Sequence, residues 1–377
     1  MMAHVVFWTS IAFIVYAYLG YPLVLLALSV FRSRPVDKRS ITPTVSFIIT
    51  AYNEEKLIRE KIENTLKQDY PKGKIEIMVA SDCSSDRTDE IVRSYQSQGI
   101  RLVRASERKG KEYVQRLAVA AARGEILVFS DVATILQPDG ISNIVKNFND
   151  PTIGCVSSVD RFLADGMVSG EGAYVRYEMC LRNLETKANS LVSLSGSFFA
   201  ARREVCQNWA VDLQSDFNTL LNAVKMGLRG VSDPDSIGYY KSIADEKKEF
   251  ERKVRTVVRG ISVFMKSLPM LNPFRYGLFS WQLFSHKLCR WLVPFAMILA
   301  FFSNAALIPV SAFYLYVFIL QLVFYAVALG GTWMNLSPVK YVLKVPSFFV
   351  LVNLSILNAW YCYIRGERMV SWNPSER

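Results

Sequence analysis

Histidine and paired cysteine, the residues that most often build transition-metal and disulfide sites, are scarce in this sequence. Only two of its 377 residues are histidine, and neither His4 nor His286 has a partner at metal-ligand spacing. Six cysteines are scattered along the chain without a Cys-x-x-Cys pair. This usage fits thiols kept reduced in a cytosolic domain better than a disulfide framework or a zinc site.

Charge is absent from three long stretches, residues 1–31, 291–339 and 345–364. The whole chain is 51% hydrophobic and 20% charged, which excludes an ordinary soluble protein. A bilayer is crossed by about 20 predominantly apolar residues. We therefore predict α-helical transmembrane segments at 5–30, 288–307, 311–333 and 345–364. A cleaved signal peptide is the alternative for the first segment, but the apolar stretch is too long and no basic residue precedes it.

Basic residues next to the apolar stretches set the expected orientation. Those that follow the first segment are Arg32, Arg34, Lys38 and Arg39. Since positive charge is retained on the cytosolic side, we predict a cytosolic central domain and an amino terminus outside. Three further crossings would leave the tail outside, although its arginines, Arg365, Arg368 and Arg377, favour the inside. One interpretation is that a carboxy-terminal segment is re-entrant or interfacial.

The net charge of +11, from 44 basic and 33 acidic residues, points to an anionic partner. No nucleic-acid-binding module follows from the residue spacing, so we predict no nucleic-acid partner. An anionic membrane face and an anionic substrate remain. Residues 276–290 alternate aromatic and basic side chains, which is typical of an interfacial helix and equally of a buried amphipathic helix.

The region between the charge-free stretches alternates between two periodicities. Strand-length runs rich in β-branched residues lie at 45–49, 75–79, 100–103 and 126–129. Helical periodicity separates them at 54–68, 86–98 and 111–123. The sequence therefore predicts an α/β fold with a mostly parallel sheet and covering helices, in which ligands bind beyond the carboxyl ends of the strands.

Polar turns follow all four predicted strands. The turn at 50–55 ends in acidic residues and contains Asn53, a possible helix cap, and the turn at 81–88 is acidic and could equally cap a helix. The turn at 108–111 is basic and is either an anion cradle or an exposed loop. Asp131 ends a buried strand, where an unpaired carboxylate is costly unless a cation neutralises it. Together the turns predict a pocket for a nucleoside diphosphate and a divalent cation.

Six ordered motifs extend this pattern beyond single turns. They are VSFIITAYNE at 45–54, ASDCSSDRT at 80–88, RKGK at 108–111, RGEILVFSD at 123–131, GSFFAARR at 196–203 and Asp216-Phe217. With these motifs the chain resembles the membrane-bound inverting glycosyltransferases of family 2, and in particular the hyaluronan- and poly-N-acetylglucosamine-synthase-like members. The resemblance covers about residues 43–260 and implies a GT-A nucleotide-sugar fold.

The resemblance also implies an organisation and a setting. It divides the chain into an anchor at 1–31, a cytosolic GT-A domain at 32–245, amphipathic helices at 246–287 and membrane helices with a tail at 288–377. It implies transfer of a sugar from a UDP-sugar to a glycan or lipid-linked acceptor in the inner (plasma) membrane of a bacterium. Membrane lipids and other proteins of a membrane complex are the further partners.

The resemblance assigns roles to individual residues. Ala51, Tyr52 and Glu54 would border the uridine, Asp82 would contact the base or ribose, and Lys111 would lie near the nucleotide. Asp131 would bind the donor diphosphate through Mg²⁺ or Mn²⁺, hard cations that prefer oxygen ligands. Asp216 would be the general base that takes the acceptor proton, and Arg255 would stabilise the leaving diphosphate.

Four residues depart from the family pattern. Cys83 stands in place of glycine, Ala133 in place of a second metal-side acid, Ser215 in place of an acid, and Thr256 in place of a tryptophan that stacks on sugar. Ala133 and Ser215 motivate the alternative of a catalytically impaired subunit with an assembly or regulatory role. A transporter is disfavoured, because the predicted spans contain no charged residue in their interior.

Overall fold

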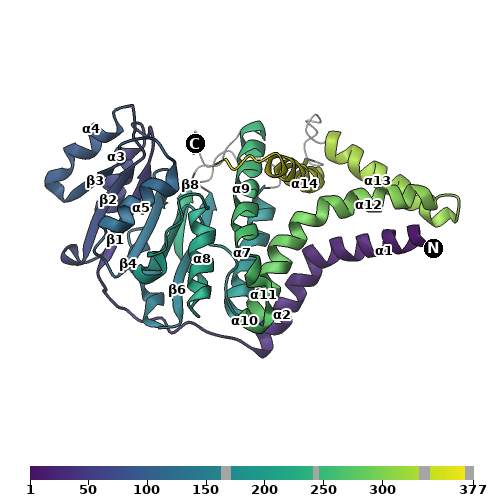
Figure 1. Cartoon of the computed structure of the whole chain (residues 1–377), viewed down its shortest axis with the longest axis horizontal. Coiled ribbons are helices and arrows are strands. Elements are labelled where there is room, and N and C mark those ends of the chain that lie inside the picture. The colour runs from purple at the N-terminus through teal and green to yellow at the C-terminus, as the bar shows by residue number, and fades with distance from the viewer. Residues whose placement is uncertain (163–170, 241–245, 331–339, 370–377) are drawn as a thin grey trace.

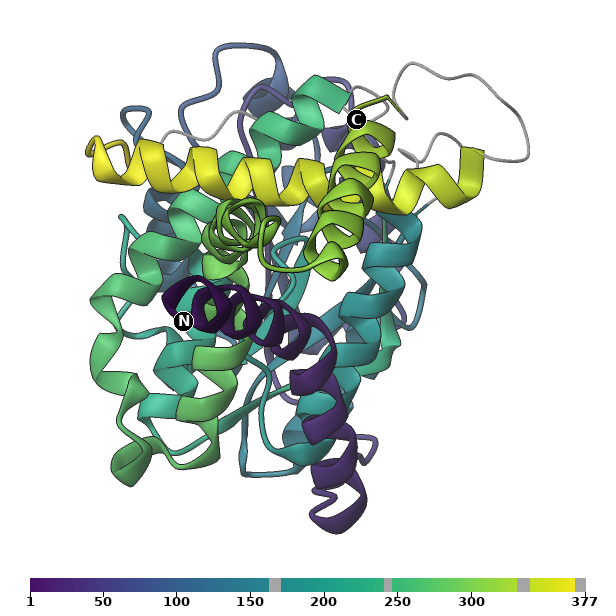
Figure 2. The same cartoon turned by 90° about the vertical axis from the view of Figure 1, so that its right-hand side faces the viewer.

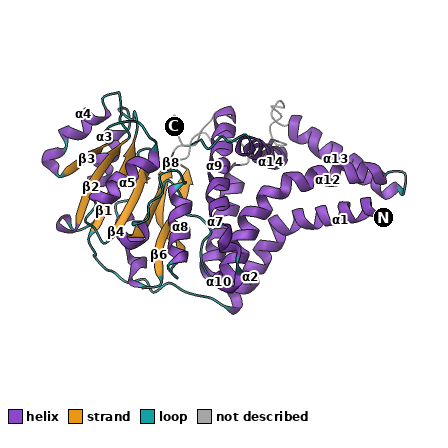
Figure 3. Ribbon diagram, viewed as in Figure 1, coloured by secondary structure: helices purple, strands orange, loops and turns teal. Residues whose placement is uncertain are grey.

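The computed structural model describes residues 1–162, 171–240, 246–330 and 340–369. An α/β domain forms one end of the molecule and a set of long helices forms the other (Figure 1). Figure 3 shows that the strands are confined to the first of these parts.

One half of the central sheet has the predicted parallel strands. They are β1 (Val45–Ala51), β2 (Ile75–Ser81), β3 (Ile100–Arg104) and β4 (Ile126–Asp131), paired in the order β3-β2-β1-β4. The helices between them are α3 (Ile58–Leu66), α4 (Thr88–Ser94) and α5 (Lys111–Ala121). The carboxyl ends of these strands therefore lie at one edge, as the sequence predicts.

The other half of the sheet is mixed. Its strands are β5 (Ile135–Leu136), β6 (Ile153–Phe162), β7 (Phe198–Arg202) and β8 (Arg229–Tyr240). Strand β7 pairs antiparallel with both β4 and β6, whereas β6 pairs parallel with β8. The helices of this half are α6 (Gly140–Lys146), α7 (Glu171–Ala188) and α8 (Ser215–Lys225). Because β7 enters from the opposite direction, the loop before it meets the carboxyl end of β4.

Side chains of the sheet alternate between two cores. Phe47 and Ile49 pack into the core that includes Ile58 of α3, whereas Ile48 packs into the core with Val114 of α5. This alternation is the period of two expected for a strand that is buried on both faces. Apolar side chains thus cover both faces of β1. The residues that can contact a ligand lie beyond its carboxyl end.

The helical part is built from both ends of the chain. Its elements are α1 (Met2–Val15), a π-helical turn (Tyr16–Gly20), α2 (Tyr21–Phe31), α9 (Glu246–Lys266), α10 (Pro273–Tyr276), α11 (Leu278–Leu283), a second π-helical turn (Phe284–Cys289), α12 (Arg290–Leu307), α13 (Ala312–Gly330) and α14 (Lys340–Ile364). Among the described residues, three helical segments are long and apolar enough to cross a membrane, Met2–Phe31, Leu278–Leu307 and Pro346–Ile364. A shorter apolar helix, Ala312–Ala328, lies between the last two.

The apolar helices do not all run in one direction. Helices α1, α12 and α13 extend away from the α/β domain, with the turn between α12 and α13 at their far end (Figure 1). Helix α14 runs across them, close to the domain, as Figure 2 shows. The sequence predicts four crossings, with the alternative that one carboxy-terminal segment is re-entrant or interfacial, but it does not indicate which segment differs in direction.

Candidate functional site

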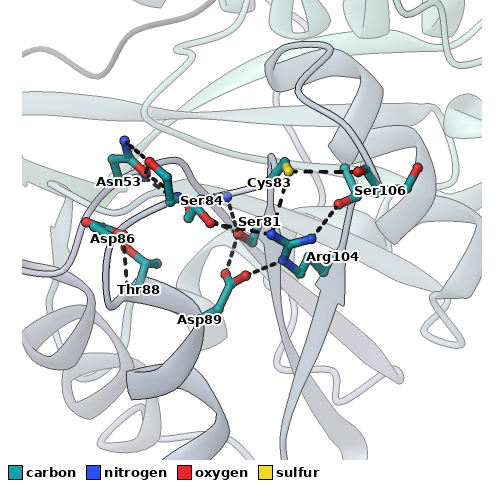
Figure 4. Close-up of polar contacts among 11 residues, drawn as sticks. Asn53, Ser81, Cys83, Ser84, Asp86, Thr88, Asp89, Arg104 and Ser106 are labelled. Carbon is teal, nitrogen blue, oxygen red and sulfur yellow. Dashed lines mark hydrogen bonds and ion pairs between the residues drawn. The ribbon is translucent and has the colours of Figure 1, made fainter.

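The turns after β1 and β2 are joined by hydrogen bonds (Figure 4). Asn53 lies in the left-handed backbone region with φ 51°, and its Oδ1 accepts a hydrogen bond of 2.8 Å from the Ser85 amide. The Glu54 amide donates to Thr88 Oγ1 at 2.7 Å. Asn53 is not a helix cap, because α3 begins at Ile58 and its N-cap residue is Leu57. Its side chain instead connects the first two strand ends.

Cys83 accounts for one departure from the family pattern. Its backbone φ is 57°, in the left-handed region that favours glycine. Beneath it, Asp89 accepts hydrogen bonds of 2.5 Å from Ser81 Oγ and from Arg104 Nε (Figure 4). The turn therefore keeps the conformation that glycine would adopt, at the cost of backbone strain at Cys83.

Asp82 has a different environment from the one the resemblance implies. Its side chain is fully buried, and its carboxylate accepts hydrogen bonds from the amides of Lys109 at 3.0 Å and Gly110 at 2.9 Å. Asp82 therefore holds the basic turn in place, and Gly110 enters that turn with φ 97°. Contact of Asp82 with a base or ribose stays a prediction that these contacts do not favour.

Three other predicted nucleotide-binding residues lie at the end of β1. Ala51 is fully buried, and its backbone carbonyl oxygen accepts a hydrogen bond of 3.0 Å from the Asp82 amide. The half-buried Tyr52 ring lies under the Arg108 guanidinium at 3.9 Å. Glu54 is half-buried and anchored through its amide as described above. Tyr52 and Arg108 thus form a flat aromatic-cation surface beside the basic turn.

Lys111 connects the ends of β4 and β7. This first residue of α5 places its Nζ 2.5 Å from Asp131 Oδ1 and 3.4 Å from the Gly196 carbonyl oxygen. Asp216 reaches the same loop, since a Cβ built on Gly196 would lie 3.1 Å from Asp216 Oδ2. Asp131 and Asp216 therefore both lie beside the Gly196 loop.

Asp216 is a buried acid at the amino-terminal end of α8. Gln214 Nε2 donates a hydrogen bond of 3.2 Å to its Oδ2. Burial raises the pKa of Asp216, and the positive charges of Lys111, Arg259 and Lys287 oppose that rise. A carboxylate with a raised pKa and nearby positive charge is suited to accept a proton.

Arg255 and Arg259 are one turn apart on α9, so they lie on one face of that helix. Arg259 pairs with Glu112, which is adjacent to Lys111 in the first turn of α5. Burial and the charge of Arg259 lower the pKa of Arg255. Arg255 does not line the cavity beside Asp216, among the residues that the structure describes there. Its role at the leaving group stays a prediction.

A cavity of about 340 Å³ opens beside Asp216. Its wall combines residues of the α/β domain with residues of α9, α12 and α14, namely Asp160, Arg182, Thr256, Trp291, Val352 and Ile356 among others. Trp291 packs against Gly260, where a Cβ would lie 3.1 Å from the indole ring. An aromatic wall is therefore present although Thr256 replaces the expected tryptophan.

The sequence motifs did not indicate several charged residues at this cavity. Arg290 Nη2 lies 2.6 Å from Glu178 Oε1, and His286 Nδ1 lies 2.6 Å from Glu185 Oε1. Burial alone would raise the pKa of Glu178, but Arg290 and His286 hold it well below its usual range. The available signal was the placement of His286, Lys287 and Arg290 directly before an apolar stretch.

The donor set at Asp131 limits how a divalent cation could bind. Within the described part of the chain, no group of three His, Cys, Asp or Glu side chains could hold a metal ion. Asp131 offers one carboxylate, whose Oδ1 faces Lys111. One carboxylate together with diphosphate oxygens and water fits Mg²⁺ or Mn²⁺, which take oxygen ligands and keep several waters. The site therefore fits a cation that arrives with its nucleotide.

Part of the chain is similar in sequence to a known family. Residues 46–209 match the family described as "Glycosyl transferase family 2". The poly-beta-1,6-N-acetyl-D-glucosamine synthase of Staphylococcus aureus strain COL is 24% identical over 49% of this chain and 46% of its own length. That of Staphylococcus epidermidis strain ATCC 35984 is 22% identical over 45% of this chain and 42% of its own length. The chain thus spans about half the length of the curated relatives it matches.

The fold is shared with a solved glycosyltransferase over nearly the whole chain. A mannosyltransferase from Pyrobaculum calidifontis, solved with GDP-Man and Mn²⁺, superposes with a TM-score of 0.72 at 24% identity. The superposition covers 95% of this chain and 99% of the other. Residues 46–209 therefore match glycosyltransferase family 2, and the chain as a whole has a GT-A-like fold.

Proposed function

We propose that the protein is an inverting glycosyltransferase that moves a sugar from a nucleotide donor to an acceptor at the cytosolic face of a membrane. The observation that carries this proposal is the link through Lys111 and Gly196 between Asp131 and Asp216. It sets a site for a charged leaving group next to a buried base. The approach of α9, α12 and α14 to the same cavity supports a reaction at the membrane.

The donor diphosphate binds on the side of Lys111 and Asp131. The amino terminus of α5 carries the positive end of the helix dipole, and Gly110 keeps the approach to it free of a side chain. The Lys111 ammonium, now paired with Asp131, offsets charge that develops on the diphosphate as the glycosidic bond breaks. The Tyr52–Arg108 surface is the proposed base platform.

The acceptor binds on the side of Asp216. Asp216 takes the proton of the acceptor hydroxyl while that oxygen attacks the anomeric carbon from the face opposite the diphosphate. A single displacement of this kind inverts the sugar. Burial raises the pKa of Asp216 and so favours its acceptance of a proton, and the neighbouring cations Lys111, Arg259 and Lys287 oppose that rise.

A divalent cation, Mg²⁺ or Mn²⁺, would be held by Asp131 and would supply further neutralisation of the diphosphate charge. This chain provides the remaining positive charge from Lys111, with Arg255 and Arg259 on the adjacent face of α9. For the donor we propose a UDP-sugar. GDP-mannose is the competing candidate, because it is the nucleotide sugar in the superposed mannosyltransferase.

Nucleotide release tests the proposal. The full chain in detergent is incubated with a panel of UDP- and GDP-sugars, Mg²⁺ or Mn²⁺ and a membrane lipid extract, and free nucleotide is measured. We expect turnover with one donor and its loss in Asp216→Asn. Asp212→Asn is the matched control, since Asp212 is exposed and pairs with Lys266 at the surface. Absence of nucleotide binding by calorimetry would favour the assembly or regulatory role instead.

A further inference from the structure

The cavity beside Asp216 contains more positive charge than its carboxylates balance. Its basic residues are Arg182, Arg252, Lys253, Lys287 and Arg290, and its acidic residues are Asp160, Glu178 and Asp216. Glu249, just outside the cavity, lies 2.7 Å from both Arg252 and Lys253. Arg290 is held by Glu178 as described above. Two basic side chains then remain, Arg182 and Lys287.

Both of these side chains are bound to neutral groups. Lys287 Nζ donates to Ser193 Oγ at 2.9 Å, and Arg182 donates to Ser157 Oγ at 3.1 Å and to the Leu194 carbonyl at 3.3 Å. Across the described ranges, no carboxylate lies within ion-pair distance of either residue. Glu178 and Glu185 attract Lys287 only from beyond contact distance. A cation without a carboxylate in contact is costly at a partly buried position, so an anion that enters the cavity is favoured there.

The acids of the cavity are already occupied. Asp160 accepts hydrogen bonds of 2.7 Å from Ser195 Oγ and 2.6 Å from Ser197 Oγ. Asp216 accepts a hydrogen bond from Gln214 Nε2, and Lys287 Nζ lies 5.0 Å from the ring centre of the adjacent Phe217. The proton-accepting group and the anion-attracting pair thus belong to one cavity and come from different elements of the fold.

The remaining wall is apolar and belongs to helices that could span a membrane. Val352 and Ile356 come from α14, and Trp291 comes from the first turn of α12. The segments Leu278–Leu307 and Pro346–Ile364 are both long and apolar enough to cross a membrane. The hydrocarbon chain of a bound ligand can therefore extend out of the cavity along these helices without entering water.

We propose that this cavity binds an acceptor whose sugar is joined to a membrane lipid through a phosphate or diphosphate, with the anion on Lys287 and Arg182. The inference rests on the proposed function and narrows its acceptor to an anionic lipid-linked sugar. The sugar hydroxyl faces Asp216, and the hydrocarbon chain follows α14. The volume of about 340 Å³ falls within the ~300–1,000 Å³ of ordinary ligand sites.

Binding measured without any donor sugar separates this inference from the proposed reaction. The full chain in phosphatidylcholine nanodiscs is titrated with farnesyl diphosphate, with farnesol and with inorganic diphosphate, and binding is followed by tryptophan fluorescence. We expect farnesyl diphosphate to bind the most tightly of the three. If farnesol bound equally tightly, the cavity would not recognise the anionic group. If inorganic diphosphate bound equally tightly, the cavity would not recognise the hydrocarbon chain, and either result contradicts the proposal.

Variants of the two basic residues locate the site. Lys287→Met and Arg182→Met should each raise the Kd for farnesyl diphosphate about tenfold, since charged hydrogen bonds are lost. Lys287→Arg should retain binding, which also guards against a folding defect, and nucleotide affinity should not change in any of them. Lys74→Met, at an exposed lysine before β2, is the matched control. An unchanged Kd in both methionine variants overturns the inference, whereas lost nucleotide binding in the wild type overturns only the reaction.

Discussion

Asp216 is buried at a position where an ionised carboxylate is costly. This cost favours acceptance of a proton, which suits the residue to act as a base. Burial raises its pKa above the ordinary value of 3.8, while Lys111 and the Phe217 amide oppose the rise. The net result is a poorly solvated carboxyl group whose pKa stays raised. Such a group gains stability on accepting a proton, which is what the proposed reaction requires.

Replacement of Asp216 by asparagine should separate catalysis from stability. We expect sugar transfer to fall about 10²–10⁴-fold, the usual contribution of a positioned general base. A carboxyl with a raised folded-state pKa loses folding stability when it ionises, so the melting temperature of Asp216→Asn at pH 7 should equal or exceed that of the wild type. Transfer assays and thermal melts check the two parts, and a lower melting temperature would contradict the second.

The pH dependence of transfer should report the same group. Because the base works only when ionised, the rate falls on the acidic side of its pKa, and the raised pKa moves this limb above that of an ordinary aspartate. Lys111 lowers the pKa of Asp216, so Lys111→Met should move the limb to still higher pH. The residual kcat of the variant is measured from pH 4 to 8. A limb that moves downward would show that another group is titrating.

Lys61 forms hydrogen bonds to residues at the carboxyl end of β4 and just after it. It is fully buried, and its Nζ donates to Ser130 Oγ at 2.7 Å and to the Thr134 carbonyl at 2.6 Å. Burial lowers its pKa from 10.5 to about 7, against the opposing charge of Asp131. An unfolded lysine keeps its proton up to higher pH, so this group adds stability as pH rises from about 7.

Thermal melts with EDTA present test this contribution of Lys61. Relative to Lys61→Met, the wild type should gain on the order of 1–2 kcal/mol between pH 7 and 9. Comparison with the variant cancels the other titrating groups. A difference that stays constant over this range would mean that Lys61 keeps its ordinary pKa in the folded protein.

At the scale of elements, the position of Asp216 depends on how closely α8 lies on the sheet. Gly230 of β8 permits this contact, since a Cβ there would lie 2.1 Å from Leu220 Cδ1 and 3.0 Å from Cys155 Sγ. Leu220 and Cys155 are both fully buried. The glycine therefore controls the distance between α8 and the strands that carry the Gly196 loop.

Gly230→Ala should push α8 outward. We expect a loss of about 1–3 kcal/mol in unfolding free energy, the usual cost of overpacking a core, and a lower kcat because Asp216 moves with its helix. The double variant Gly230→Ala/Leu220→Ala frees space and should cost less than the sum of its single changes. Denaturant unfolding of the four proteins measures this coupling. Additive effects would mean that the two residues do not compete for the same space.

At the scale of the whole molecule, the direction of α14 bears on the position of the carboxy terminus. Helices α1, α12 and α13 extend away from the domain, and α14 runs across them beside it (Figures 1 and 2). If α14 lies along the membrane surface, the tail stays on the side of the catalytic domain. Arg365 and Arg368, which are exposed, then obey the same charge rule as the basic residues after α2.

Labelling with a membrane-impermeant thiol reagent tests this arrangement. In a Cys83→Ser/Cys180→Ser background, Ser311→Cys at the turn before α13 should react from one side of the membrane. Arg368→Cys and Lys74→Cys should both react from the other side. Reaction of Arg368→Cys from the side of Ser311→Cys would show that α14 crosses the membrane.

The sequence by itself determined the strands β1 to β4, the helices between them and the apolar segments, because hydrophobic periodicity is a local property. It also indicated Asp131 and Asp216 through strand ends and family motifs. It did not predict the antiparallel entry of β7, which depends on pairing between distant segments. Nor did it show that Asp82 is buried in a turn.

Tertiary structure alone decided which distant residues meet. Gly196 is known from the sequence only as the first residue of the GSFFAARR motif, yet in the fold Asp131 and Asp216 meet at its loop. Lys287 and Arg182 belong to different elements and become an anion-attracting pair only when α7 and the segment before α12 pack together. Local sequence reports which face of a segment is buried, whereas long-range packing selects the partner that buries it.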